Sequence, residues 1–91
     1  MPYRVLIDEK AGRQFERLPR NLRRRVDVRI LALAHDPRPV GVKRIRNNLY
    51  RVRVGQHRIA YTIEDERIVV RVVAVGHRND VYRLLRRMGY L

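Results

Sequence analysis

The fold is decided by the stretch Tyr50-Arg51-Val52-Arg53-Val54-Gly55-Gln56-His57-Arg58-Ile59-Ala60-Tyr61. Apolar and polar side chains alternate on both sides of Gly55-Gln56, and a two-residue loop with glycine first is typical of a type II′ hairpin turn. That turn sets the register of the two strands, so Arg53 lies opposite Arg58 and Arg51 lies opposite Ala60. Because neighbouring side chains on a strand point to opposite faces, the three arginines share one face of the predicted sheet.

Three arginines on one face of the sheet limit the surroundings in which that face is stable. Like charges placed directly opposite each other on paired strands destabilise a hairpin. A folded chain tolerates them most easily at a solvated surface, where an anionic partner offsets the repulsion. The hairpin therefore predicts a surface built for a polyanion.

The next strand, residues 67–76, is almost continuously apolar, which is typical of a central strand that is buried on most of its surface. A turn at Asp65-Glu66 is expected to join it to the hairpin, pairing Tyr61 with Val70. In this register the core face of the sheet carries Tyr50, Val52, Val54, Ile59, Tyr61, Ile63, Ile68, Val70, Val72 and Ala74. The opposite face carries the hairpin arginines, Arg71, Val73 and Val75, and it leads out to His77 and Arg78.

The segments around these strands carry helix and loop signals. Residues 2–7 alternate like an opening strand, and residues 9–18 repeat apolar side chains at helical spacing until Pro19 ends the segment. Residues 22–35 predict a second amphipathic helix, whose run of arginines we interpret as a solvated face. Residues 36–41 form a loop, and residues 43–48 make a short basic approach to the hairpin. Asn79 or Asp80 is expected to cap a final helix.

The order of elements is therefore β-α-α-β-β-β-α. It predicts an α+β fold in which two N-terminal helices pack on one face of a twisted antiparallel sheet, with a short C-terminal helix at the edge of the sheet. A chain of 91 residues without a linker or a repeat predicts one domain, residues 1–91.

The charge of the chain indicates the class of partner. Lys and Arg number 22 against 9 Asp and Glu, which gives a formal net charge of +13 at pH 7. A field of this sign attracts nucleic acid or an acidic protein. Only Lys10 and Lys43 are lysines, and guanidinium groups suit bidentate contacts with phosphate.

Composition excludes several classes of site. Cysteine is absent, which removes thiol catalysis and cysteine-based zinc sites and fits a cytoplasmic location. The three histidines lack the spacing of metal ligands and the carboxylates are scattered, so we expect no metal, no cofactor and no paired-carboxylate catalysis. No apolar run approaches the roughly 20 residues that span a membrane, so no membrane partner is expected.

Two motifs, Leu49 to Tyr61 and Val75-Gly76-His77-Arg78-Asn79-Asp80-Val81-Tyr82, together resemble the RelE branch of the RelE/ParE toxin superfamily. The resemblance implies a RelE-like fold and the toxin part of a type II toxin-antitoxin system. It implies cleavage of messenger RNA in the ribosomal A site, through attack of a ribose 2′-hydroxyl on the adjacent phosphate without a metal. It also implies an acidic, RelB-like antitoxin as partner in a hetero-oligomer, beside the ribosome and messenger RNA.

The same resemblance implies roles for single residues. Arg51 and Arg53 match basic strand positions that are lysine in some relatives, and Arg58 matches a phosphate-stabilising arginine. Arg78 matches a basic residue implicated in protonating the leaving group, and Tyr82 matches an aromatic near the substrate base. Arginine keeps its proton at neutral pH, so His77 and Tyr82 are the candidates for the general base. The expected catalytic residues are Arg51, Arg53, Arg58, His77, Arg78 and Tyr82, and the expected RNA-binding residues are Lys43, Arg44, Arg46 and Arg71.

Two other functions stay open on the same residues. A ParE-like inhibitor of DNA gyrase would use the fold for protein binding and would need no catalytic arginines. A non-catalytic basic module would bind RNA through charge alone. The C-terminal helix likewise has two interpretations, a fixed part of the domain or a detachable element that an antitoxin peptide covers or displaces.

Overall fold

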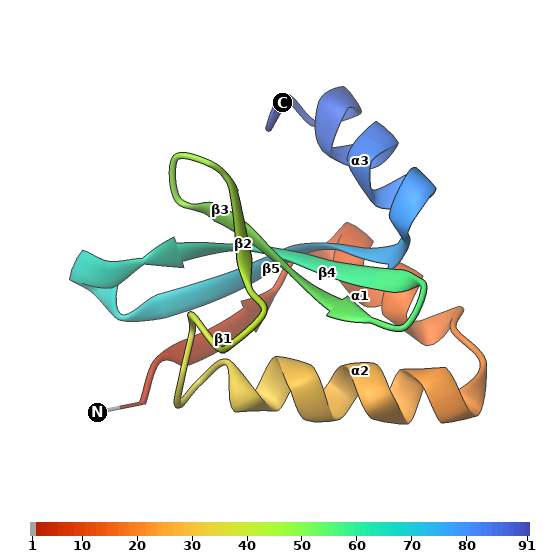
Figure 1. Cartoon of the computed structure of the whole chain (residues 1–91), viewed down its shortest axis with the longest axis horizontal. Helices are drawn as coiled ribbons and strands as arrows, with labels where there is room; N and C mark the ends of the chain where they lie inside the picture. Colours follow the sequence, from red (N-terminus) through yellow and green to blue (C-terminus); the bar gives the residue numbers. More distant parts are fainter. Residues whose placement is uncertain (1) are drawn as a thin grey trace.

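The computed structural model describes residues 2–91 as three α-helices, a short 3₁₀ helix and a five-stranded sheet (Figure 1). The elements are β1 (Arg4–Ile7), α1 (Glu9–Glu16), α2 (Arg20–Ala32), β2 (Lys43–Arg46), β3 (Leu49–Val54), β4 (His57–Glu64), η1 (Asp65–Arg67), β5 (Val69–His77) and α3 (Arg78–Arg87). The α+β class and the three helices of the prediction are confirmed. The chain forms one strand more than predicted, β2.

The strands form a single sheet in the order β1-β5-β4-β3-β2. β2 to β5 pair antiparallel, as predicted, whereas β1 pairs with β5 in parallel. The predicted antiparallel sheet therefore gains a parallel edge strand. The residues of β1 encode its alternation but not its partner, and the path from β1 to β5 is long enough for a parallel crossover.

β2 forms where the sequence indicated only a basic approach to the hairpin. Lys43 pairs with Arg51 and Arg44 with Tyr50, and a bulge separates Arg44 from Arg46. Charged side chains and bulges are typical of edge strands, which pair on one side only. The charges of β2 hide the apolar alternation by which a strand is usually recognised.

The hairpin of β3 and β4 has the predicted register, with Arg53 opposite Arg58 and Arg51 opposite Ala60. Gly55 has a φ of +60°, the left-handed value that the first loop position of a type II′ turn requires. Local turn chemistry therefore specifies this part of the sheet.

The connection from β4 to β5 corrects the predicted two-residue turn at Asp65-Glu66. The chain forms η1 instead, and Ile68 follows it in the left-handed region with a φ of 55°. The longer connection moves β5 along β4, so Tyr61 pairs with Val72 rather than with Val70. Ile68 leaves the predicted core face and is 39% exposed.

A bulge between Ala60 and Tyr61 shifts the register a second time and pairs Ile59 with Val75. The extra residue on β5 reverses the alternation beyond it. Val75 consequently lies in the core between the sheet and α2, and Ala74 lies on the other face, which corrects the predicted placing of both residues.

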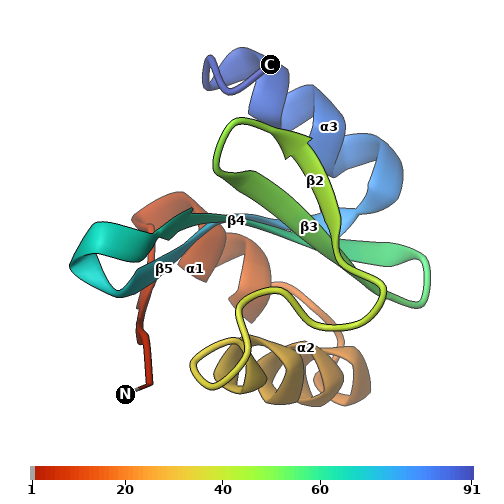
Figure 2. The ribbon, with the colours of Figure 1, turned by 60° about the vertical axis from the view of Figure 1, so that its left-hand side comes forward.

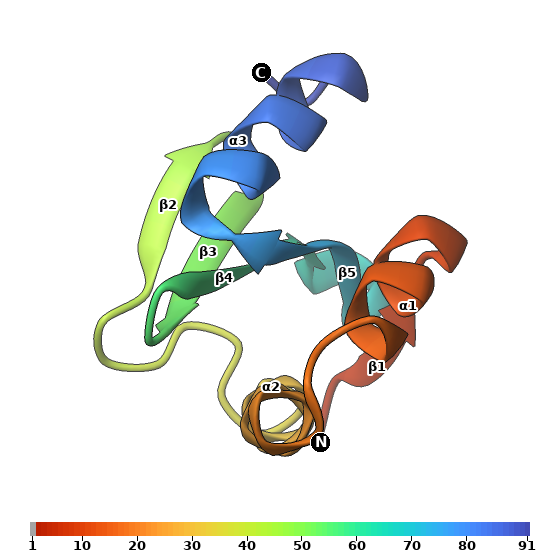
Figure 3. The ribbon, with the colours of Figure 1, turned by 90° about the vertical axis from the view of Figure 1, so that its right-hand side faces the viewer.

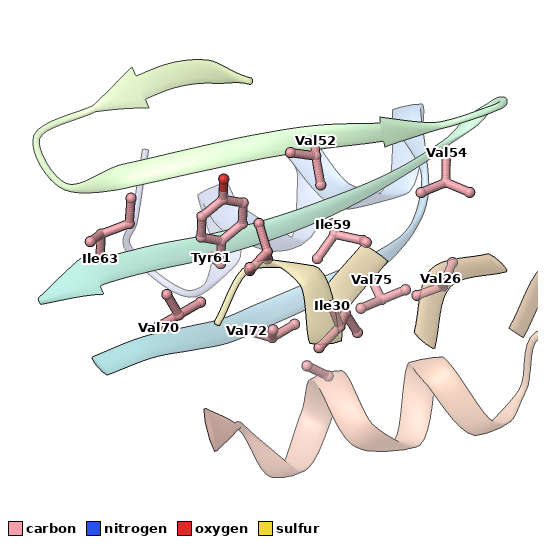
Figure 4. Close-up of a cluster of buried hydrophobic side chains, with 12 residues drawn as sticks. Val26, Ile30, Val52, Val54, Ile59, Tyr61, Ile63, Val70, Val72 and Val75 are labelled. Carbon is pink, nitrogen blue, oxygen red and sulfur yellow. The ribbon is translucent and has the colours of Figure 1, made fainter. Parts of the chain in front are cut away.

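The predicted packing of α1 and α2 on one face of the sheet is confirmed (Figure 3). Strand side chains such as Val52 and Tyr61 meet Val26 and Ile30 of α2 in this core (Figure 4). The first core consists of Ala11, Val26, Ile30, Leu33, Val52, Val54, Ile59, Tyr61, Ile63, Val70, Val72 and Val75.

The other face of the sheet is covered in part by α3, which corrects the prediction of a helix at the edge of the sheet. The twist of the sheet brings β2 and β3 up beside α3 (Figure 2). A second core forms between them from Leu49, Ala60, Val73, Ala74, Val81 and Leu85. This second core holds α3 next to the hairpin arginines.

Candidate nucleic-acid interface

Basic side chains from the strands and from α3 gather on the sheet face that lies opposite α1 and α2. Arg53 and Arg58 are direct cross-strand partners. The charges of Arg51, Arg53 and Arg78 all act on Arg58, as does the nearby Tyr82. We call Arg51, Arg53, Arg58 and Arg78 the basic cluster, and Tyr82 lies beside it.

Arg58 occupies the centre of the basic cluster and is only 7% exposed, whereas the sequence predicted a solvated position. Its Nη1 donates to the carbonyl oxygens of Gly55 at 3.2 Å and of His57 at 3.0 Å, so the hairpin turn holds the guanidinium in place. Burial lowers the pKa of Arg58, and the charges of Arg51 and Arg53 lower it further. The direction of this shift follows from a positive charge that is held in a buried position among like charges.

Arg51 offers an unused hydrogen-bond donor. Its Nε is buried and has no partner among residues 2–91. A buried donor without an acceptor costs about 1–3 kcal/mol.

Acidic side chains do not neutralise the basic cluster. The ion pairs within the described part of the chain are Arg13–Glu9, Arg38–Asp65, Arg67–Glu64, Arg71–Asp8, Arg71–Glu64 and Arg83–Asp80. None of these pairs includes a member of the basic cluster. The positive charge at the hairpin is therefore available to an external anion.

The start of α3 is fixed by the hairpin turn. The helix begins at Arg78, with His77 as its N-cap, which corrects the predicted cap at Asn79 or Asp80. The backbone N–H of Arg78 donates to the carbonyl oxygen of Gln56 at 3.0 Å. This bond sets the first turn of α3 against the tip of the hairpin.

Tyr82 follows Arg78 by four residues, so the two side chains lie on the same face of α3. Tyr82 is half-buried and packs against the second core. Val81 and Leu85 are fully buried and anchor the helix to the sheet. The aromatic ring is thereby held beside the basic cluster.

His77 does not join the basic cluster. It pairs with His57, which lies opposite the core residue Val54, so both imidazoles lie on the sheet face that α1 and α2 cover. The Nδ1 of His77 accepts a hydrogen bond from the backbone N–H of Asn79 at 3.4 Å. The structure thus separates one of the two general-base candidates from the arginines.

The expected RNA-binding residues divide into two groups. Lys43 pairs with Arg51 and Arg46 pairs with Leu49, so both extend the face of the basic cluster onto β2. Arg44 pairs with Tyr50 and lies on the other face.

Arg71 also stands apart from the cluster. It pairs with Asp8 and Glu64, each at 3.3 Å, and hydrogen bonding to Asp8 raises its pKa. Its charge is balanced within the fold, which indicates a structural role.

Sequence reasoning missed the contact between His57 and His77, because their pairing depends on the bulge in β5. It also missed the alignment of Lys43 with Arg51, because β2 was not recognised as a strand. Among residues 2–91 no group of three or more acidic or histidine side chains could hold a metal ion. No helix in that range is long and apolar enough to cross a membrane.

Comparisons with known proteins agree with this geometry. The family model for the ParE toxin of the type II toxin-antitoxin system parDE matches residues 5–82. Toxin RelG of Mycobacterium tuberculosis is 37% identical, over 91% of this chain and 99% of that protein.

Two solved structures show the same fold. The archaeal RelE–RelB complex from Pyrococcus horikoshii is 26% identical with a TM-score of 0.78, covering 86% of this chain and 97% of that one. A mutant of E. coli toxin RelE in the free state is 25% identical with a TM-score of 0.77, covering 91% of this chain and 93% of that one. The chain therefore belongs to the RelE/ParE family of type II toxin-antitoxin toxins, on the RelE side of that family.

Proposed function

We propose that this toxin is a ribosome-dependent endoribonuclease that cleaves messenger RNA in the A site. The observation that carries the proposal is the basic cluster, in which arginines gather around the buried Arg58 without an acidic partner in residues 2–91. A phosphate diester is the anion that such a cluster suits, because guanidinium groups donate several hydrogen bonds to phosphate oxygens.

The reaction is attack of a ribose 2′-hydroxyl on the adjacent phosphate. The bond from the 2′-oxygen to phosphorus forms and the bond from phosphorus to the 5′-oxygen breaks, leaving a cyclic phosphate and a 5′-hydroxyl. Negative charge builds up on the phosphorane oxygens between these events. Arg58 and Arg51 stabilise that charge, and Arg58 is preorganised by its bonds to the hairpin carbonyls.

Proton transfer is assigned to α3 and needs no metal. Arg78 donates a hydrogen bond to the departing 5′-oxygen, which takes its proton from water, and the place of Arg78 is set by its backbone bond to Gln56. Tyr82 is the neighbouring group that can take the proton of the 2′-hydroxyl or stack on the base. Arginine at positions 51 and 53 supplies charge without acting as a base, because it keeps its proton.

The partner of the toxin is an acidic, RelB-like antitoxin in a hetero-oligomer, as in the RelE–RelB complexes whose toxin chains share this fold. A net charge of +13 attracts such a protein and would be neutralised by it. A substrate on the translating ribosome places the activity in the cytoplasm.

Primer extension on a defined messenger RNA, with and without ribosomes, tests this function. We expect cuts only with ribosomes, and a rate reduced by about 100-fold or more in Arg58→Ala. Arg67→Ala is the matched control, because it removes the same charge from an exposed arginine in η1. Equal cutting by Arg58→Ala and Arg67→Ala would remove the basic cluster from the mechanism.

Inhibition of DNA gyrase is the second candidate, and the match to the ParE family model favours it. A supercoiling assay with purified gyrase separates the two functions. Inhibition of supercoiling without cutting of messenger RNA would replace the nuclease assignment. RNA binding without any product would leave the non-catalytic module.

A further inference from the structure

A groove on the sheet face opposite the basic cluster contains two histidines that the proposed reaction does not use. The groove has a volume of about 460 Å³ and runs between the segment after α1 and the first turns of α3. His57 and His77 are cross-strand partners in its lining. Their rings pack edge to face, with centroids 5.8 Å apart.

Both rings are joined to Arg78 by short connections. His57 follows Gln56, whose carbonyl oxygen accepts the backbone N–H of Arg78 at 3.0 Å. His77 precedes Arg78 and caps α3 through its Nδ1. The ring contact is therefore a second link between the hairpin tip and the first turn of α3, in addition to the backbone hydrogen bond from Arg78 to Gln56.

We propose that the contact between His57 and His77 is a positioning element, which holds the first turn of α3 against the hairpin and so places Arg78 and Tyr82 beside Arg58. The inference rests on the proposed nuclease function. Neither ring touches the reacting phosphate in this account. A displacement of about 1 Å in a catalytic group can cost up to 100-fold in rate, so a contact at this point is strongly coupled to activity.

The charges around the pair make it sensitive to acid. The charged groups that act on His57 are His77 of β5, Arg25 of α2, its chain neighbour Arg58, which points to the other face of the sheet, and Asp80 of α3, and Arg17 lies in the same groove lining. Burial lowers the pKa of His57, the charges of His77, Arg25 and Arg58 lower it further, and only Asp80 raises it. The pKa of His57 in the folded protein lies below the unfolded value of about 6.5. The packing of α3 against the hairpin is therefore fully stable above that pH and loses stability as the pH falls below it.

Two substitutions separate ring packing from charge. His57→Phe keeps an aromatic partner for His77 and cannot take a proton, whereas His57→Ala removes the ring. At about pH 7.5 and saturating ribosomes, we expect His57→Ala to cut about tenfold more slowly and His57→Phe to restore the rate to within about twofold. The ribosome concentration that gives the half-maximal rate should not change, because His57 positions groups within the toxin and takes no part in binding the ribosome.

The dependence of the cleavage rate on pH tests the effect of protonating His57. Dividing the wild-type rate by the His57→Phe rate removes the ribosome's own response to pH. We expect this ratio to fall as the pH drops below about 6.5, the unfolded pKa of histidine. A constant ratio would contradict the proposal.

Hydrogen exchange at the Arg78 amide measures positioning without ribosomes. We expect faster exchange in His57→Ala and protection near the wild-type level in His57→Phe. If wild type cuts no RNA, the proposed nuclease fails while the exchange rates still decide this inference. Equal protection of the Arg78 amide in wild type and a folded His57→Ala would overturn it, as would a folded His57→Phe that is as impaired as His57→Ala. If circular dichroism shows that His57→Ala does not fold, the pH comparison of wild type with His57→Phe decides.

Discussion

At the scale of single residues, Arg53 and Arg58 show how a site can oppose stability. The two arginines are direct cross-strand partners, and Arg58 is buried while Arg53 is exposed. Like charges in this position destabilise a hairpin by about 0.2–1 kcal/mol. An anion bound next to the two guanidinium groups would offset this repulsion.

Arg53→Gln should therefore stabilise the fold while weakening the proposed activity. Removing the repulsion is expected to raise the free energy of unfolding by about 0.5 kcal/mol, measured by urea denaturation. Cleavage of messenger RNA on the ribosome should fall in the same variant, because less charge faces the phosphate. Loss of both stability and cleavage would indicate that Arg53 supports the fold instead.

Tyr61 separates a core role from a role in the site, because the sequence placed it on the core face of the sheet. Its ring is fully buried, and its hydroxyl donates to the carbonyl oxygen of Pro37 at 2.7 Å. Tyr61→Phe should lower the free energy of unfolding by about 1–3 kcal/mol, since the carbonyl loses its buried partner. Cleavage at a temperature where the variant is folded should stay at the wild-type level. A specific loss of cleavage without a change in stability would move Tyr61 into the site.

At the scale of elements, the two hairpins show what a sequence specifies locally. The β3–β4 hairpin could be predicted because Gly55-Gln56 has only a few compatible turn types and the flanking strands alternate strictly. The β4–β5 connection could not, because Asp65-Glu66 lacks a glycine or asparagine and the apolar run of β5 fits several registers. The bulge that redirects Val75 is chosen by packing on both faces, which local sequence does not reveal.

Glycine substitutions test the assigned turn. Gly55→Ala forces a side chain into a left-handed conformation and should cost about 1–2 kcal/mol of unfolding free energy. Gly12→Ala in α1 is the control, since a methyl group there makes an ordinary contact at 3.9 Å with Ile7. It should stabilise the protein by about 0.5–1 kcal/mol. Equal shifts of the melting temperature in Gly55→Ala and Gly12→Ala would contradict the turn assignment.

Asp65 ties η1 to the residue before β1 and to the loop that follows α2. Its carboxylate accepts a hydrogen bond from the hydroxyl of Tyr3 at 2.7 Å and pairs with Arg38 at 2.8 Å. The bonds from Arg38 and Tyr3 lower the pKa of Asp65. The guanidinium of Arg38 also lies over the ring of Tyr50, 5.2 Å from its centroid.

Acid should therefore weaken the fold through Asp65. A depressed folded pKa contributes stability above the unfolded value of about 3.9, and this contribution is lost as the pH falls through the folded pKa. Asp65→Asn should be less stable than wild type at neutral pH, and the difference should vanish in strong acid. Glu66→Gln, which removes an exposed carboxylate from the same turn, should show no such trend. A difference in stability between wild type and Asp65→Asn that stays the same at every pH would contradict this link between the Asp65 pKa and stability.

At the scale of the whole molecule, the sequence predicts residue positions that one turn sets, but not positions that depend on how distant strands meet. The sequence predicted the basic face correctly for Arg51, Arg53 and Arg58, because their register follows from one turn. It did not predict the separation of His77 or the balanced charge of Arg71, because both depend on how distant strands meet. The roles of these residues in catalysis stay predictions.

The dependence of RNA binding on salt should report the basic cluster. Each phosphate that a protein neutralises on single-stranded nucleic acid contributes about −0.7 to the slope of log affinity against log salt. A double variant, Arg51→Gln with Arg53→Gln, should make this slope shallower by about 1.4, measured by fluorescence anisotropy with a short RNA. Arg67→Gln, far from the cluster in η1, should leave the slope unchanged. An equal change in both proteins would mean that only net charge matters.

The most direct test of the whole account is single-turnover cleavage on ribosomes stalled with a defined codon in the A site. Wild type should cut a codon made of ribonucleotides and should leave the same codon intact when its three nucleotides carry 2′-deoxyribose. Arg58→Ala should cut the ribonucleotide codon about 100-fold more slowly, while Arg67→Ala should match wild type. Cutting of the 2′-deoxy codon, or full activity in a folded Arg58→Ala, would contradict attack by a 2′-hydroxyl at a phosphate held by the basic cluster.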